Sequence, residues 1–135
     1  MQQPPIQKTG RPMLIRATLL TVAYVIVVSI LTHVPIAESL VPITRRVDKL
    51  GHFSIYAVMA FLIVWALGPS TKKAVFAFVM TLVIASIDEL GQAFVPSREV
   101  DFLDWVCSVA GAAVGAWCYL RWSTRRRPAT SHRQA

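Results

Sequence analysis

Three short polar groups interrupt an otherwise apolar chain of 135 residues. They are Asp48-Lys49-Leu50-Gly51-His52, Asp88-Glu89-Leu90-Gly91-Gln92, and Pro96-Ser97-Arg98 followed by Asp101 and Asp104. Their cationic side chains could contact a phosphate or a carboxylate, and their carboxylates and amide could hold hydroxyl, amide or amine groups. Each group lies at the edge of an apolar run of membrane length, where charged side chains usually serve a partner, a ligand or an ion path. These groups therefore form the candidate site.

The composition of the chain is that of a membrane protein. It is 55% hydrophobic and 16% charged, with a mean hydropathy of +0.53, which is more apolar than a soluble domain with a polar surface. About 20 apolar residues cross a bilayer as a helix, and the chain offers four such runs: 17–34, 50–71, 74–94 and 105–120. The sequence predicts an all-α integral membrane four-helix bundle over residues 13–122, with flexible basic tails at 1–12 and 123–135. A signal peptide is disfavoured because no convincing cleavage site follows the first run.

The distribution of lysine and arginine predicts the orientation of the bundle. With four spans both tails lie on one side, which carries ten of the 14 basic residues, and the other side carries the remaining four: Arg45, Arg46, Lys49 and Arg98. The positive-inside rule then places both termini in the cytoplasm and the three polar groups on the extracytoplasmic face of a bacterial inner membrane. Because membrane anchors account for the net charge of +7, membrane lipid is an expected partner and nucleic acid is not.

Within the expected helices, polar residues recur every three or four positions and so share one helix face. The sets are Asp48, His52 and Tyr56; Asp88 and Gln92; and Asp104, Ser108, Gly111 and Gly115. The two glycines form a small-xxx-small surface, which we expect to bring their helix tightly against a neighbour within the same chain. That approach would carry Asp104 and Ser108 to the seam where Asp88, Glu89 and His52 meet.

Several of these motifs occur together in a known family. They are Asp48-Lys49-x-x-His52-Phe53 with Tyr56, Asp88-Glu89-x-x-Gln92-x-Phe94-x-Pro96-x-Arg98, and Asp104 with Gly111-x-x-x-Gly115. Over residues 47–114 the chain resembles the VanZ-like family, although Ser97 replaces the usual glycine and Ser108 the usual asparagine or aspartate. The resemblance implies an integral membrane protein of a family named for low-level resistance to the glycopeptide teicoplanin.

Three functions are compatible with these residues. The favoured one is a non-enzymatic envelope protein that binds a glycopeptide, a lipid-linked wall precursor or a lipid headgroup. The candidate ligand-binding residues are Asp48, Lys49, His52, Tyr56, Asp88, Glu89, Gln92, Arg98, Asp104 and Ser108. The alternatives are a membrane hydrolase or transferase with His52 or Glu89 as general base, and a set of purely structural ion pairs.

The pattern gives no clear signature of catalysis or of a metal. No Ser-His-Asp or Cys-His nucleophile arrangement is evident, so the favoured function is not enzymatic, while catalytic turnover stays open. One histidine among several carboxylates is a weak metal signature, so neither a metal nor another cofactor is expected. The identity of the ligand and the oligomeric state are not specified by these motifs.

Overall fold

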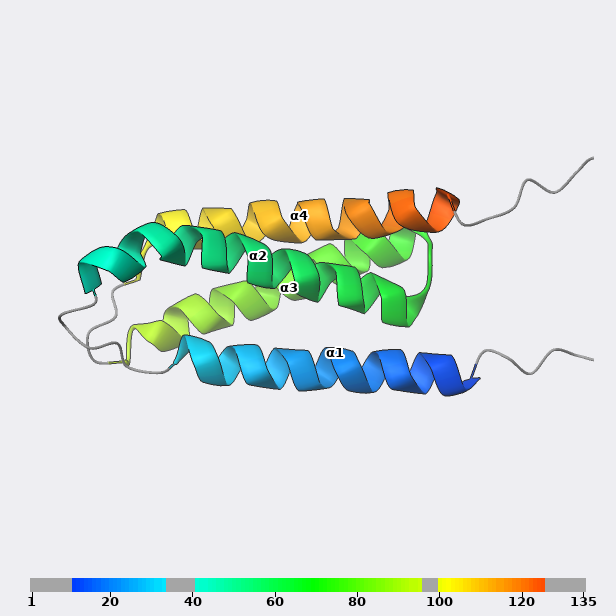
Figure 1. Cartoon of the computed structure of the whole chain (residues 1–135), viewed down its shortest axis with the longest axis horizontal. Coiled ribbons are helices and arrows are strands. Elements are labelled where there is room, and N and C mark those ends of the chain that lie inside the picture. Colours follow the sequence, from blue (N-terminus) through cyan, green and yellow to red (C-terminus); the bar gives the residue numbers. More distant parts are fainter. Residues whose placement is uncertain (1–10, 34–40, 96–99, 126–135) are drawn as a thin grey trace, which may run out of the picture.

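The computed structural model describes residues 11–33, 41–95 and 100–125. In these ranges the chain forms four helices and no strand: α1 (Arg11–Thr32), α2 (Val41–Leu67), α3 (Thr71–Gln92) and α4 (Phe102–Arg125). Each helix is long and apolar enough to cross a membrane. The prediction of an all-α membrane bundle with four spans is confirmed. The first residue of α1 and the last residue of α4 lie at the same end of the bundle (Figure 1).

Two helices extend beyond the expected spans. α2 begins at Val41, before the expected run at 50–71, so residues 41–49 are already helical. Pro42 is compatible with this start, because the first N–H groups of a helix have no intrahelical acceptor to lose. α4 continues to Arg125, so the first residues of the expected tail, from Ser123 onward, belong to the helix.

The closest helix pair is α2 with α4, which make the most extensive contact in the bundle. Gly111 and Gly115 face α2, and a Cβ atom at either position would collide with the carbonyl oxygen of Phe53 or Ala57 respectively. The two backbones therefore touch where the glycines lie. Small buried alanines on both helices continue this packing toward the end of the bundle where α1 begins and α4 ends. Such close approach between spanning helices is what small residues four positions apart permit.

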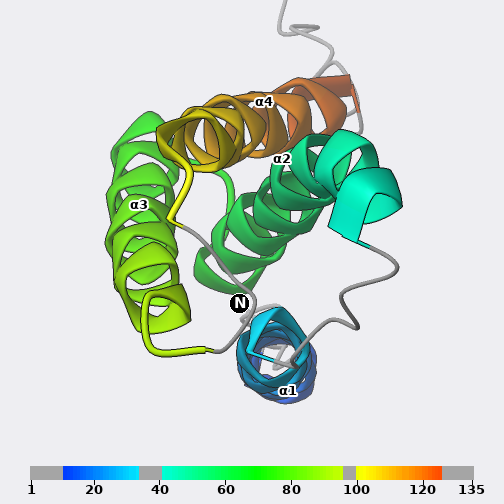
Figure 2. The same cartoon turned by 90° about the vertical axis from the view of Figure 1, so that its left-hand side faces the viewer.

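The helix α1 is the most peripheral of the four and packs mainly on α2 (Figure 2). It touches the bundle through a narrow polar stripe, in which Thr21 Oγ1 lies 3.3 Å from Leu62 O and Tyr24 Oη donates to Ile55 O at 3.0 Å. The other faces of α1 expose large apolar side chains, such as Leu19 and Ile30. An exposed apolar surface on a spanning helix faces lipid, where only the helix can satisfy the backbone polar groups.

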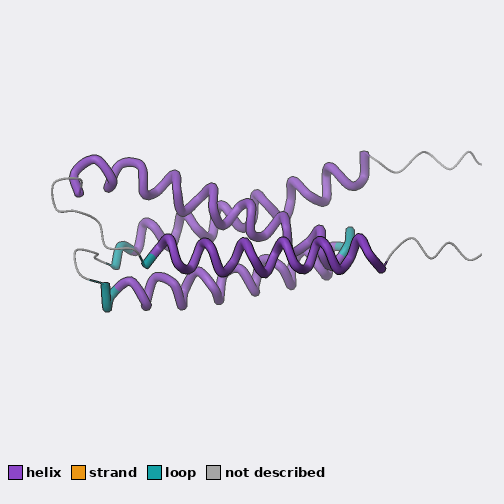
Figure 3. The backbone as a smooth tube through the Cα atoms, turned by 60° about the horizontal axis from the view of Figure 1, so that its bottom comes forward, coloured by secondary structure: helices purple, strands orange, loops and turns teal. Residues whose placement is uncertain are grey.

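The turn between α2 and α3 closes the end of the bundle opposite the polar groups. Gly68 has a positive φ of 91°, and its N–H donates to Val64 O at 2.7 Å, as at a left-handed helix C-terminus. Lys73 Nζ also donates to Leu67 O at 2.5 Å. The short turn predicted at Gly68-Pro69-Ser70-Thr71 is present, and Thr71 is already the first residue of α3. Among the described residues, loops lie only at the ends of the bundle (Figure 3).

Candidate functional site

The polar groups meet at one end of the bundle, because α2 and α4 begin there and α1 and α3 end there (Figure 1). Seven polar residues of the described ranges are buried at this end, each with 7% or less of its surface exposed: Thr32, His52, Asp88, Glu89, Gln92, Asp104 and Ser108. Burying polar groups in a membrane-spanning bundle is unfavourable unless they have partners. Their partners divide the site into two halves.

The first half is centred on the carboxylate of Asp88, near the end of α3. Thr32 Oγ1 of α1 lies 2.8 Å from Asp88 Oδ1, and Tyr56 Oη of α2 donates to Asp88 Oδ2 at 2.8 Å. Gln92 Nε2 lies 3.4 Å from the same Oδ2 atom. A carboxylate accepts hydrogen bonds at both oxygens, so Asp88 joins α1, α2 and α3. We name Asp88, Thr32, Tyr56 and Gln92 the Asp88 network.

The second half is built on residues 48–52 of α2 and the start of α4. Lys49 Nζ donates to Asp101 Oδ2 at 2.6 Å and to Asp104 Oδ1 at 2.9 Å. Asp101 Oδ1 accepts from the backbone N–H of Leu103 at 2.8 Å, which is the position of a helix N-cap. The backbone N–H of Asp101 in turn donates to Glu89 Oε1 at 2.8 Å. Lys49 therefore links α2 to α4, and Glu89 links α3 to the start of α4.

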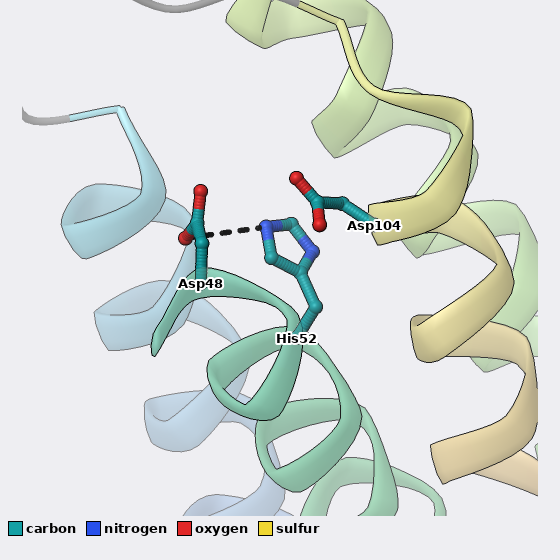
Figure 4. A group of neighbouring side chains, drawn as sticks. All are labelled: Asp48, His52 and Asp104. Atoms are coloured by element: carbon teal, nitrogen blue, oxygen red, sulfur yellow. Dashed lines mark ion pairs between the residues drawn. The ribbon is translucent and has the colours of Figure 1, made fainter. Parts of the chain in front are cut away.

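The imidazole of His52 lies beneath this ion pair. His52 Nδ1 is 3.2 Å from Ser108 Oγ, and Ser108 Oγ donates to the backbone oxygen of Asp104 at 2.9 Å. On the other side of the ring, His52 Nε2 is 3.8 Å from Asp48 Oδ1. Asp48 and Asp104 lie on either side of the His52 ring, one from α2 and one from α4 (Figure 4). The ring of Tyr56 stacks on the imidazole of His52, with 6.1 Å between the ring centroids, and so connects the two halves.

The structure brings most of the candidate residues together. Nine of the ten lie at this end of the bundle, and Arg98, the tenth, lies outside the described residues. Within the described part of the chain, the cation that pairs with the carboxylates is Lys49.

Sequence reasoning missed two residues of α1. Thr32 and His33 end this helix beside Asp88, where His33 Nδ1 donates to Ser29 O at 2.7 Å and lies 3.5 Å from Asp88 Oδ1. Gly91 leaves the space that the His33 ring occupies, because a Cβ atom there would collide with the ring. The signal in the sequence was the position of Thr32 and His33 at the same end of a span as the other polar groups.

A comparison with protein families agrees with this arrangement. The model of the VanZ/LLP1 family matches residues 6–123, which include every helix residue described above up to the last turn of α4. The chain belongs to the VanZ/LLP1 family. The resemblance noted in the motifs is thereby confirmed, and the protein is a multi-pass membrane protein of the VanZ type. Comparisons with curated proteins and with solved structures each gave no significant match.

In this VanZ/LLP1 protein, the two halves of the site differ in whether they leave a hydrogen-bond donor for a ligand. Both oxygens of Asp88 accept hydrogen bonds from within the bundle. Lys49 has three N–H donors and uses two of them on Asp101 and Asp104, while about a third of its side chain is exposed. The second half therefore keeps one lysine N–H donor at the surface, beside partly exposed carboxylates.

Proposed function

We propose that this VanZ/LLP1 protein binds the headgroup of a lipid-linked wall precursor at the extracytoplasmic face of the bacterial inner membrane. The observation that carries the proposal is the partly exposed Lys49 between Asp101 and Asp104, at the end of the bundle where polar residues of all four helices converge. The third N–H of Lys49 would donate to a phosphate oxygen of the precursor. Asp101 would accept from neighbouring amine or hydroxyl groups.

Two further ligands share this chemistry and act as outcomes of the same test. A glycopeptide such as teicoplanin carries amine, hydroxyl and carboxylate groups, and binding it would support a resistance-type role like the one for which the family is named. An anionic lipid headgroup carries a phosphate alone. The site has both signs of charge, which favours a ligand that offers both acceptors and donors over a simple phospholipid.

The test uses the full chain in nanodiscs of zwitterionic lipid. We expect a fluorescent pyrophosphate-linked wall precursor to bind, and Lys49→Met to weaken its binding at least tenfold, whereas Lys49→Arg keeps most of it. The matched control is Lys72→Met, because Lys72 is an exposed lysine at the opposite end of the bundle. Membrane abundance and helical content of each variant separate loss of binding from loss of folding. Equal affinities for wild type and Lys49→Met would refute the proposal.

A membrane hydrolase or transferase is the second candidate, and one observation favours it. Contrary to the expectation from sequence, Ser108, His52 and Asp48 follow one another in space, in the order of a nucleophile, a base and a carboxylate. However, Ser108 is only 1% exposed and its hydroxyl donates to a backbone oxygen. A buried hydroxyl of this kind is poorly placed to attack a lipid-linked substrate. Release of a water-soluble product by the wild-type protein would establish catalysis over simple binding.

A further inference from the structure

We propose that Asp48, His52 and Asp104 form a binding site for a divalent transition metal, with Zn²⁺ the best match. One atom from each side chain lies within 4.8 Å of the other two. Asp48 and His52 come from α2 and Asp104 from the first turn of α4, and their side chains point toward a common volume (Figure 4). The proposal concerns this trio alone and does not depend on the ligand of the proposed function.

The hydrogen bonds around His52 indicate which ring nitrogen is available to a metal. Ser108 Oγ has one hydrogen, which it donates to the backbone oxygen of Asp104 at 2.9 Å. Toward His52 the serine can then only accept, so His52 Nδ1 carries the proton and Nε2 carries a lone pair. This lone pair points toward Asp48 Oδ1, 3.8 Å away, which is also an acceptor. Two acceptors that face each other attract a cation between them.

The burial of the trio fits a site that is closed on one side and open on the other. The side chains of His52 and Asp104 are 5% and 10% exposed, whereas that of Asp48 is 33% exposed. Most of the imidazole is therefore buried, and the entrance lies on the side of Asp48. An opening on one side leaves coordination positions for water or for a ligand group, as in zinc sites with three protein ligands.

The distances need only a small adjustment. Tetrahedral Zn²⁺ with bonds of about 2.0–2.1 Å places its ligand atoms roughly 3.3 Å apart. The separation of His52 Nε2 and Asp48 Oδ1 is 3.8 Å, and the largest separation in the trio is at most 4.8 Å. Lys49 holds only Oδ1 of Asp104, and Oδ2 accepts no hydrogen bond from the described residues. Rotation of the Asp104 carboxylate is therefore sufficient to close the site.

The surrounding residues support the ligands in the way that metal sites require. Metal-binding histidines commonly donate their second ring N–H to a fixed acceptor, which sets the tautomer and the ring orientation. Ser108 Oγ has this position beside His52 Nδ1, and Lys49 holds the carboxylate of Asp104. One imidazole and two carboxylates suit Zn²⁺ or Mn²⁺ better than the hard cations Ca²⁺ and Mg²⁺, which prefer oxygen ligands alone. Although the sequence alone predicted no metal, this arrangement points to one.

The experiment measures Zn²⁺ bound to the purified full chain, without an affinity tag and after chelator treatment. The two free cysteines, Cys107 and Cys118, are replaced by alanine so that thiols do not bind the metal. We expect one Zn²⁺ per chain by elemental analysis, and competition with a chromophoric chelator gives its affinity. His52→Gln and Asp48→Asn should each lower that affinity at least tenfold, and Ca²⁺ should not compete.

The matched control is His33→Gln, which removes a histidine at the same end of the bundle but outside the trio. It should bind Zn²⁺ like the parent protein. Absence of bound Zn²⁺ in a folded parent protein would overturn the proposal, and so would an unchanged affinity in His52→Gln. Unchanged precursor binding in Lys49→Met, with one Zn²⁺ bound to the parent protein, would refute only the proposed function, whereas a parent protein that binds the precursor but no Zn²⁺ would refute only the metal site.

Discussion

Replacing Tyr56 with phenylalanine tests the Asp88 network. Tyr56 is 1% exposed, and phenylalanine fills the same volume without its hydroxyl, so the substitution leaves no large cavity. It removes the 2.8 Å hydrogen bond to Asp88 Oδ2 and leaves that oxygen with Gln92 Nε2 at 3.4 Å. We therefore expect a clear decrease in the free energy of unfolding, although the substitution removes only one hydroxyl group.

The magnitude follows from the kind of acceptor. Hydrogen bonds to charged groups contribute about 1.5–3 kcal/mol, and neutral ones about 0.5–1.5 kcal/mol. In membrane proteins the average is lower, about 0.6 kcal/mol, with a maximum near 1.7 kcal/mol. Since the acceptor is a buried carboxylate, Tyr56→Phe should cost about 1.5 kcal/mol, near the upper end of that range. The matched control is Tyr24→Phe, which removes a 3.0 Å hydrogen bond to the backbone oxygen of Ile55 and should cost about 0.6 kcal/mol.

The assay is reversible unfolding of the chain in mixed micelles, followed by the fluorescence of its tryptophans. A double-mutant cycle with Asp88→Asn separates the coupling between the two side chains from other effects. A coupling energy of about 1 kcal/mol or more is expected, because the two groups contact each other directly. The reasoning would be refuted if Tyr56→Phe cost no more than Tyr24→Phe, or if the cycle showed no coupling.

Two other predictions concern packing and orientation. Gly115→Ala should destabilise the bundle by about 1–3 kcal/mol in the same unfolding assay, because its Cβ would collide with Ala57 O, whereas Gly51→Ala, with open space around it, should cost far less. In a cysteine-free background, Val100→Cys should react with a membrane-impermeant thiol reagent in intact cells and Pro69→Cys should not. The opposite labelling pattern would reverse the orientation inferred from the basic residues and place the site in the cytoplasm.

Much of the fold follows from local patterns in the sequence. Four apolar runs of about the length of a bilayer crossing indicate four helices, and the spacing of Asp48, His52 and Tyr56 puts them on one face of α2 whatever its neighbours are. Gly111 and Gly115 similarly indicate the face of α4 that approaches another helix. These are statements about single helices, whose geometry is fixed by the backbone.

Contacts between helices were harder to predict. Thr32 is a hydroxyl residue in an apolar helix, and such residues commonly bond to their own helix, as Thr18 Oγ1 does to Leu14 O and Thr21 Oγ1 to Ala17 O. Nothing local distinguishes Thr32, which contacts Asp88 across 56 positions of sequence. The start of α2 was missed for a related reason, because Pro42 is typical of a loop and equally suits the first turn of a helix.

The polar end has two halves, and they support different hypotheses from the sequence. One half fits a structural role for these residues, and the other fits ligand binding. In the Asp88 network, both carboxylate oxygens accept hydrogen bonds and thereby connect three helices, so the main role of its members is to stabilise the bundle. The half around Lys49 and His52 leaves one lysine N–H, one histidine lone pair and one oxygen of Asp104 without a hydrogen bond from the described residues. Among the described residues, Thr81 Oγ1 is the only buried side-chain N or O atom without a hydrogen-bond partner, so these atoms reach solvent. Their persistence on a rigid frame is what a ligand or metal site requires, since binding supplies the missing partners and the frame holds the geometry.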